Sequence, residues 1–316
     1  MNSIISSFSS PPAKAGEDFS FRESAFDFFF CSLPSENTRE AYGRVISRLA
    51  SFLGDAGVGL EVASPVHLGA YREYLAKEGY SVATIKLHVT AIRSFYSHLS
   101  SSGLISVNPA ANLKAPRLVR DVGATPIFSS VKEVEQFLSI FDETTMLGLR
   151  NKAMLSVLFF SMIRSSALCG MNFDDVKHHS SHISITVREK RGRVREIPLN
   201  SYAAGLLLRY ISRSGISSGP LFLTGSKGSE VLKDKRISRS DLHYLIKRYL
   251  KKAKIDISLS AHSFRASGCT YYLESAGATL EHAQRLLGHS SSATTALYDR
   301  RKKIVPVLEV ERLSFA

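Results

Sequence analysis

Two arginines, two histidines and a tyrosine in the second half of the chain are the residues best suited to chemistry. Arg164 follows an apolar stretch, His262 and Arg265 open a predicted helix, His289 follows another helix, and Tyr298 comes nine residues later. Guanidinium groups offer paired N–H donors to anionic oxygens and stay charged, so two of them suit a phosphate and its transition state. A tyrosine hydroxyl has a pKa of about 10 and must lose its proton to attack, a transfer that a histidine can assist. The set therefore predicts nucleophilic attack on a phosphodiester.

A strongly basic segment lies between the first arginine and this group. Around one glycine, Gly192, it contains Arg188, Lys190, Arg191, Arg193 and Arg195. Basic side chains gathered at one turn favour contact with phosphates, and we assign that role to Arg188, Arg191 and Arg193. Lys190 differs from them, because a lysine crowded by arginines has a lowered pKa and can give up its proton, whereas an arginine does not readily do so.

The charge of the whole chain agrees with a polyanionic partner. There are 41 Lys and Arg against 28 Asp and Glu, a formal net charge of +13. Residues 121–316 hold 29 of these basic and 18 of these acidic residues, so +11 of the charge lies with the candidate chemistry. Such a balance favours nucleic acid ahead of a membrane surface.

Cysteine usage and hydropathy predict a cytoplasmic protein with no membrane partner. Cys31, Cys169 and Cys269 are far apart and in no metal or redox spacing, which fits a reducing compartment. The first residues lack the basic start and apolar core of a signal peptide. The most apolar run, 153–163, is too short to span a bilayer and predicts a buried helix.

Apolar periodicity predicts the elements that position the candidate residues. Ile183, Ile185 and Val187 alternate, and 194–199 returns as a second strand, so the basic segment is the tip of a β-hairpin. Other segments have helical spacing, namely 201–213, 239–253, 263–276 and 279–288.

The first third of the chain predicts a small all-helical unit. Asn37 and Glu40 form a capping-box pattern, Ser64-Pro65 starts a second helix, and a third begins near Ser81. On this third helix Lys86 and Arg93 fall away from the apolar face, and both are candidate phosphate contacts. We expect four segments: a flexible tail over 1–18, the helical DNA-binding domain over 19–115, a linker over 116–129, and a catalytic domain with a C-terminal tail over 130–316.

The ordered set of motifs resembles the tyrosine recombinase (phage integrase) family. The resemblance rests on Arg164, the hairpin Lys190, His262-Ser-Phe-Arg265, Leu287-Gly-His289-Ser-Ser and Tyr298. It covers about residues 35–300. It implies a mainly α fold with a small β element, whose two domains, a helical core-binding domain and a catalytic domain, close around duplex DNA.

The resemblance also implies the reaction and its partners. Tyr298 would form a 3′-phosphotyrosyl link with Lys190 protonating the leaving 5′-oxygen, and a partner strand would reverse the step with no metal or other cofactor. The implied partners are double-stranded DNA and copies of the chain, from a dimer to a tetramer on DNA. Accessory DNA-bending proteins are a further partner class that the sequence leaves open.

Three positions depart from the family pattern. Where the family carries Gly-Leu-Arg-x-x-Glu, this chain has Met162 for the glycine and Ala167 for the acid, and Ala266 replaces a second histidine. The family's carboxylate orients catalytic cations, so its absence could slow cleavage. Asp174 or Asp175 matches another family position and need not substitute.

Other interpretations stay open at this point. Ala167 motivates a non-catalytic DNA-binding protein on the same scaffold. A type IB topoisomerase or hairpin telomere resolvase, an enzyme of the same superfamily, would instead relax or seal DNA without pairing two sites. His178, His179 and His182 resemble a metal cluster, but their polar turn favours no metal. The apolar positions of the tail, Val305, Leu308, Val310 and Leu313, would pack either on a neighbouring subunit or on their own domain.

Overall fold

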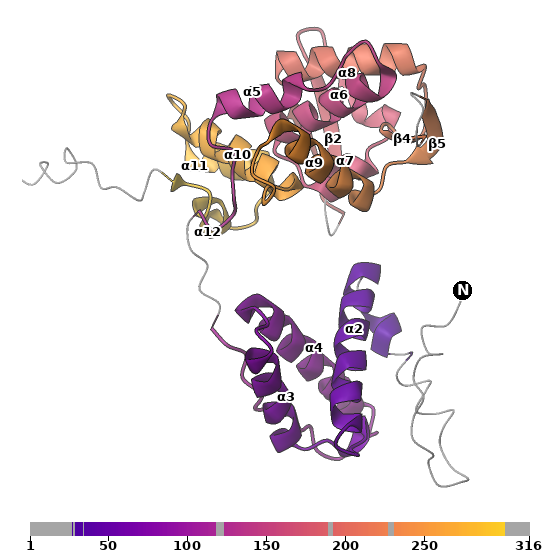
Figure 1. Ribbon diagram of the computed structural model, residues 1–316, viewed down its shortest axis with the longest axis vertical. Coiled ribbons are helices and arrows are strands. Elements are labelled where there is room, and N and C mark those ends of the chain that lie inside the picture. Colours follow the sequence, from indigo (N-terminus) through magenta and orange to yellow (C-terminus); the bar gives the residue numbers. More distant parts are fainter. Residues whose placement is uncertain are drawn as a thin grey trace, which may run out of the picture. The chain divides into compact units, whose positions relative to one another are not determined.

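The computed structural model describes residue 27 and residues 29–33, 35–117, 123–188, 192–226 and 231–300 (Figure 1). Backbone contacts divide the chain into two compact units between residues 119 and 120, and each unit has a hydrophobic core. The expected tail over 1–18, the basic residues Lys190 and Arg191, and the apolar positions beyond residue 300 lie outside the described residues.

The amino-terminal unit is helical. Its elements are α2 (Glu36–Gly54), the 3-10 helix η2 (Leu60–Val62), α3 (Pro65–Lys77) and α4 (Val82–Ser101). The side chains of Ser35, Ser64 and Ser81 cap the three α-helices by accepting backbone N–H bonds. The first cap corrects the sequence prediction: Ser35 accepts from the N–H of Thr38, so the helix begins before Asn37.

The core of this unit follows the predicted periodicity. Buried side chains recur every three to four residues along α4, among them Ile85, Val89, Ile92, Tyr96 and Leu99. They face buried residues of α2 and α3, such as Leu49 and Leu75. The exposed side of α4 is left for contacts outside the unit.

The carboxy-terminal unit is built around one buried helix, α6 (Met146–Ser161). Nearly all of its side chains from Leu149 to Ser161 are buried, which explains the apolar run in the sequence. It packs against α8 and α10 (Figure 1). The other helices are α5 (Val131–Ser139), α7 (Ser165–Gly170), η3 (Phe173–Asp175), α8 (Ser201–Ser214), α9 (Arg239–Ala253), α10 (Ala261–Glu274), α11 (Leu280–Leu287) and α12 (Ser292–Ala296).

Two small antiparallel sheets complete this unit. The first has the order β1–β2–β3, from Val176–His178, Ile183–Arg188 and Val194–Pro198. In it Ile185 lies opposite Ile197, so the predicted hairpin has its apolar residues on the core side. The second pairs β4 (Leu223–Gly225) with β5 (Leu232–Arg236). The sequence analysis did not predict β1, β4 or β5.

Candidate active site

Arg265 is a buried cation that joins three elements. It lies on α10 with 2% of its surface exposed. Its guanidinium donates to the carbonyl of Met162 at the end of α6 and, at 2.7 Å, to the carbonyl of Leu287 at the end of α11. The Nη2 atom also lies 2.9 Å from Nε2 of His289. These contacts fix the direction of the guanidinium before any substrate is bound.

Arg164 lies where α6 stops. Met162 ends this helix with a φ of 51°, a left-handed conformation that residues with side chains rarely adopt. The backbone is extended at Arg164, and α7 begins directly after it. Arg164 is half-buried, and after burial and the charge of Arg265 its positive charge is the next cause that lowers the pKa of both His262 and His289. The abrupt helix end therefore brings the second cation into the electrostatic field of the same site.

His289 follows the left-handed Gly288 that ends α11. Its Nδ1 lies 2.9 Å from the hydroxyl of the buried Thr295, and its Nε2 faces Arg265. A guanidinium can only donate, so Nε2 accepts, and the proton of the neutral ring is assigned to Nδ1, which donates to Thr295. His289 thus links α12 to Arg265.

Tyr298 has a base within hydrogen-bond reach. It follows α12 and is 9% exposed. Its hydroxyl lies 3.1 Å from Nε2 of His262. Its ring stacks on that of His289, with the centroids 5.9 Å apart and the planes at 17°. Its carbonyl accepts a bond of 3.1 Å from the hydroxyl of Thr270 on α10.

Burial and nearby cations set the protonation states of this group. Burial raises the pKa of Tyr298, while the charge and hydrogen bonding of Arg265 act in the opposite direction. Burial, then Arg265 and Arg164, lowers the pKa of His289 to about 4. The pKa of His262 is lowered by the same causes in the same order, although the side chain is itself exposed to solvent. Both rings are neutral at neutral pH, so His262 can accept the proton of Tyr298.

The position three residues after Arg164 carries no charge. Ala167 is half-buried on α7 and packs against the main core of the unit. The carboxylate of Asp175 is 2% exposed and accepts from the backbone N–H of Asn172 and from Arg188. Its contacts are thus with the start of η3 and with the basic hairpin.

Comparison with known proteins identifies the family. The phage integrase family pattern matches residues 129–303, and that of the phage integrase N-terminal SAM-like domain matches residues 33–103. The chain belongs to the phage integrase family. Tyrosine recombinase XerC of Xylella fastidiosa (strain M23) is 31% identical over 265 residues, 84% of this chain and 86% of that protein. This family member is a tyrosine-type site-specific recombinase.

Solved structures of integrases and recombinases share the fold. XerH site-specific recombinase, in a pre-cleavage complex with its difH substrate, matches with a TM-score of 0.65 and 19% identity, covering 88% of this chain and 79% of that one. A lambda integrase tetramer bound to a Holliday junction matches with a TM-score of 0.64 and 17% identity, covering 90% and 79%. These likenesses confirm the predicted fold class, mainly α with small antiparallel sheets in two domains.

The basic hairpin of the recombinase is tied to the body of its unit on the β2 side. Arg188, at the end of β2, donates to the buried carboxylate of Asp175 while 61% of its own side chain stays exposed. Arg193, on the other side of the turn, is exposed. The predicted general acid Lys190 and its neighbour Arg191 lie outside the described residues.

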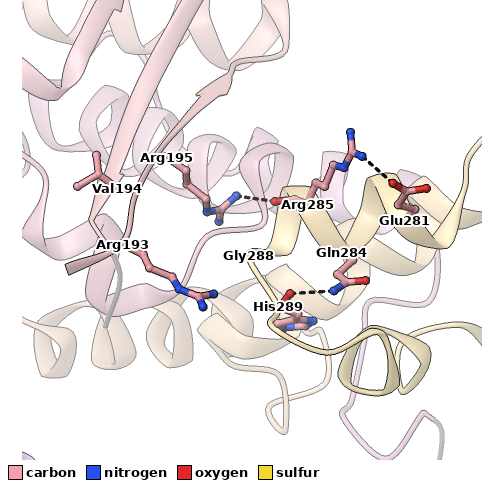
Figure 2. Close-up of a pocket in the computed structure, with 8 residues that line it drawn as sticks. All are labelled: Arg193, Val194, Arg195, Glu281, Gln284, Arg285, Gly288 and His289. Atoms are coloured by element: carbon pink, nitrogen blue, oxygen red, sulfur yellow. Dashed lines mark hydrogen bonds and ion pairs between the residues drawn. The ribbon is translucent and has the colours of Figure 1, made fainter. Parts of the chain in front are cut away.

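The β3 side of the hairpin is tied to α11, next to a hollow that Figure 2 shows. Arg195 donates to the carbonyls of Arg285 and Leu286, at 3.0 and 2.7 Å, in the last turn of α11, where carbonyls lack helical partners. The hollow has a volume of about 430 Å³ and is lined by Arg193, Val194, Arg195, Glu281, Gln284, Arg285, Gly288 and His289. The sequence placed Arg195 in the basic segment, but no local pattern predicted its anchoring bonds to a helix ninety residues away.

The predicted DNA contacts of the amino-terminal unit share one exposed face. Lys86 and Arg93 lie on α4, seven residues apart and on the side away from the core. Arg93 also lines a hollow with Ser97 and Asn108. Both cations are therefore accessible to a phosphate backbone.

The histidines near β1 make other contacts. His179 lies 2.6 Å from the carboxylate of Glu196, and its ring stacks on that of His182. Within the described ranges, no group of three or more His, Cys, Asp or Glu side chains is arranged to hold a metal ion. In that same part of the chain no helix is both long and apolar enough to cross a membrane.

Proposed function

We propose that this recombinase cleaves and rejoins duplex DNA with Tyr298 as the nucleophile. The bond from phosphorus to the 5′-oxygen breaks as the bond to the tyrosine oxygen forms, which leaves a 3′-phosphotyrosyl link and a 5′-hydroxyl. A 5′-hydroxyl from a partner strand reverses the step, so no nucleotide cofactor is consumed. The observation that carries this proposal is the 3.1 Å contact between the Tyr298 hydroxyl and Nε2 of His262.

In this mechanism different residues take up the proton of Tyr298 and stabilise the negative charge of the phosphate. His262, whose pKa is lowered, takes the proton of Tyr298 as the hydroxyl attacks. Arg265 and Arg164 bind the non-bridging oxygens of the phosphate. Because the carbonyls of Met162 and Leu287 already orient Arg265, it needs little reorganisation as charge develops. A preset donor of this kind is worth about 10²–10³ in rate.

His289 and Lys190 complete the set. His289 contacts the guanidinium of Arg265 and the ring of Tyr298, so we assign it to position that guanidinium and the nucleophile at the phosphate. Lys190 is proposed as the general acid that protonates the leaving 5′-oxygen. Its support is the anchoring of the two strands that flank this position in the sequence, through Arg188 on β2 and Arg195 on β3.

Duplex DNA is the proposed partner, in an assembly of two to four copies of the chain. The net charge of +13 and the exposed Lys86 and Arg93 support the DNA. The lambda integrase of similar fold is a tetramer on a Holliday junction, which supports the assembly. Accessory DNA-bending proteins belong to the same proposal, since bending a recombination site costs energy that a partner can offset.

A covalent-adduct assay tests the proposal. The protein is incubated with duplex DNA from the sequence flanking its gene, nicked so that cleavage traps the intermediate, and run on a denaturing gel beside Tyr298→Phe. The expected result is a shifted band for the wild type that the variant lacks. Equal DNA binding by both proteins with no adduct from either would contradict the proposal.

The uncharged Ala167 favours one rival, a DNA-binding protein on the same scaffold that does not cleave. This rival predicts sequence-specific binding without adducts. The substitution Ala167→Glu separates the two hypotheses. If the proposed function is correct, it changes the rate of a cleavage that the wild type already performs. If the rival is correct, the wild type does not cleave, and the variant either gains cleavage or also fails to cleave.

A further inference from the structure

The segment that enters the catalytic unit from the linker is bonded to the segment that carries the nucleophile. The N–H of Gly123 donates to the carbonyl of Leu297 at 3.0 Å. In return the Arg300 guanidinium donates to the carbonyls of Gly123 and Thr125, at 3.2 and 2.7 Å. Leu297 directly precedes Tyr298 and Arg300 lies two residues after it, so these bonds bracket the nucleophile.

The same linker end is itself fixed to the unit. Ile127 packs against the small cluster that contains Met162 and Tyr298. The N–H of Phe128 donates at 3.0 Å to the hydroxyl of Ser267 on α10, and its carbonyl accepts from the hydroxyl of Tyr271 on the same helix. These contacts fix residues 123–128 to the catalytic unit, and we call this segment the strap.

The backbone at Gly123 allows the close approach of Arg300. Gly123 has a φ of 77°, which favours glycine, and a Cβ atom there would lie 3.4 Å from Cζ of Arg300. The guanidinium thus packs directly on the backbone of the strap. A larger residue at 123 would strain the turn, because its φ is in the left-handed region.

The nucleophile segment is also bonded to α10. The hydroxyl of Thr270 donates to the carbonyl of Tyr298, and Asp299 is 2% exposed. Burial raises the pKa of Tyr298, and the cations that oppose this are Arg265 and Arg164. The contacts of Arg300 are instead with backbone carbonyls of the strap, so its contribution is geometric.

We infer that Arg300 is a positioning residue that clamps the nucleophile segment to the linker end and keeps the Tyr298 hydroxyl at His262. A consequence is that a change in the position of the linker end would change the position of the Tyr298 hydroxyl. The catalytic part of this inference rests on the proposed role of Tyr298. A misplacement of about 1 Å can cost about 10²-fold in rate, so even a partial loss of these contacts should slow cleavage measurably.

The first test compares single-turnover adduct formation at saturating protein. We expect Arg300→Ala to form the adduct at least about tenfold more slowly, with unchanged DNA affinity and an unchanged shape of the pH profile. Arg300→Lys should recover part of the rate, because an ammonium can still donate to the carbonyls of the strap. A wild-type rate in Arg300→Ala, or a loss that merely follows weaker DNA binding, would overturn the inference.

A matched control and a second readout separate the clamp from general stability. Arg213 also donates to two backbone carbonyls, those of Glu143 and Thr144, so Arg213→Ala removes the same kind of contact elsewhere. It should leave the cleavage rate unchanged. Hydrogen exchange should show a faster Gly123 amide in Arg300→Ala, and an unchanged amide would overturn the clamp. Exchange needs no cleavage, so an inactive wild type would contradict the function of Tyr298 while the clamp is still tested.

Discussion

The guanidinium of Arg265 donates to the carbonyl of Met162, the left-handed residue that ends α6. This bond ties α10 to the turn from which Arg164 projects, so the two arginines predicted to bind one phosphate are coupled through a single backbone group. The family pattern has a glycine at this position. The methionine keeps the conformation that the coupling needs, at an energetic cost of about 1–2 kcal/mol.

At Met162 a glycine variant should be more stable than an alanine variant, the reverse of the usual order of stability within a helix. Both remove a side chain that is 5% exposed, which costs about 2–5 kcal/mol of the free energy of unfolding. Only glycine also relieves the left-handed strain, so Met162→Gly should be more stable than Met162→Ala by about 1 kcal/mol. Urea denaturation of the two variants measures the difference, and a more stable alanine variant would show that the left-handed turn is not kept.

The lowered pKa of His289 predicts a loss of stability in mild acid. The unfolded ring binds a proton near pH 6.5, while the folded ring stays neutral down to about pH 4. Between these values the unfolded state holds more protons, so the free energy of unfolding falls as the pH falls. We expect His289→Gln to be less stable at pH 7 but to lose less stability than the wild type between pH 6.5 and 4. Parallel melting curves across that range would contradict the assignment.

Lys86 and Arg93 should act on DNA affinity through counterion release. Replacing either with alanine should lower the slope of the logarithm of the binding constant against the logarithm of salt concentration by about 1. Thr90→Ala is the control, because Thr90 lies on the same exposed side of α4 and carries no charge. If all three variants keep the wild-type slope, this face of α4 does not contact phosphates.

Replacing Arg195 and replacing Arg193 should have different effects on cleavage and binding, although the two residues are only two positions apart on the β3 side of the hairpin. Arg195→Ala removes the two bonds that fix the hairpin to α11, so the hairpin lysine loses its placement and cleavage should slow by about tenfold or more. Arg193 is exposed, and Arg193→Ala should mainly weaken binding and its salt dependence. Equal effects on rate and affinity in both variants would mean that Arg195 is not an anchor.

The sequence predicted the site better than it predicted what holds the site together. The motifs that resemble the family named Arg265, His289 and Tyr298 as site residues, and in the structure His289 contacts both Arg265 and Tyr298. The bond from Arg265 to Met162 spans 103 residues, and the one from Arg300 to Thr125 spans 175. No local periodicity reports such contacts, since they depend on how distant elements pack.

The same holds for the secondary structure: elements marked by a local sequence pattern were predicted, and others were missed. Helix α4 was predicted from its apolar face, because burial on one side imposes the 3.6-residue period. Helix α6 was predicted from its continuous apolar run, because it is buried on nearly all sides. The hairpin pair β4–β5 was missed, because the exposed and basic sequence of β5, Leu232–Arg236, has little of the alternation that marks a half-buried strand. At the start of α2 the sequence analysis gave Asn37 as the cap, whereas the structure has an extended backbone and the capping side chain at Ser35.

Mapping the trapped adduct by mass spectrometry tests the central claim most directly. Wild-type protein would be reacted with nicked DNA, digested with nuclease and protease, and its peptides searched for the mass of a nucleotide remnant. The predicted result is a single modified peptide, with the nucleotide linked through its 3′-phosphate to Tyr298. A remnant on another tyrosine, such as Tyr271 or Tyr272 of α10, or a 5′-phosphate linkage, would contradict the account.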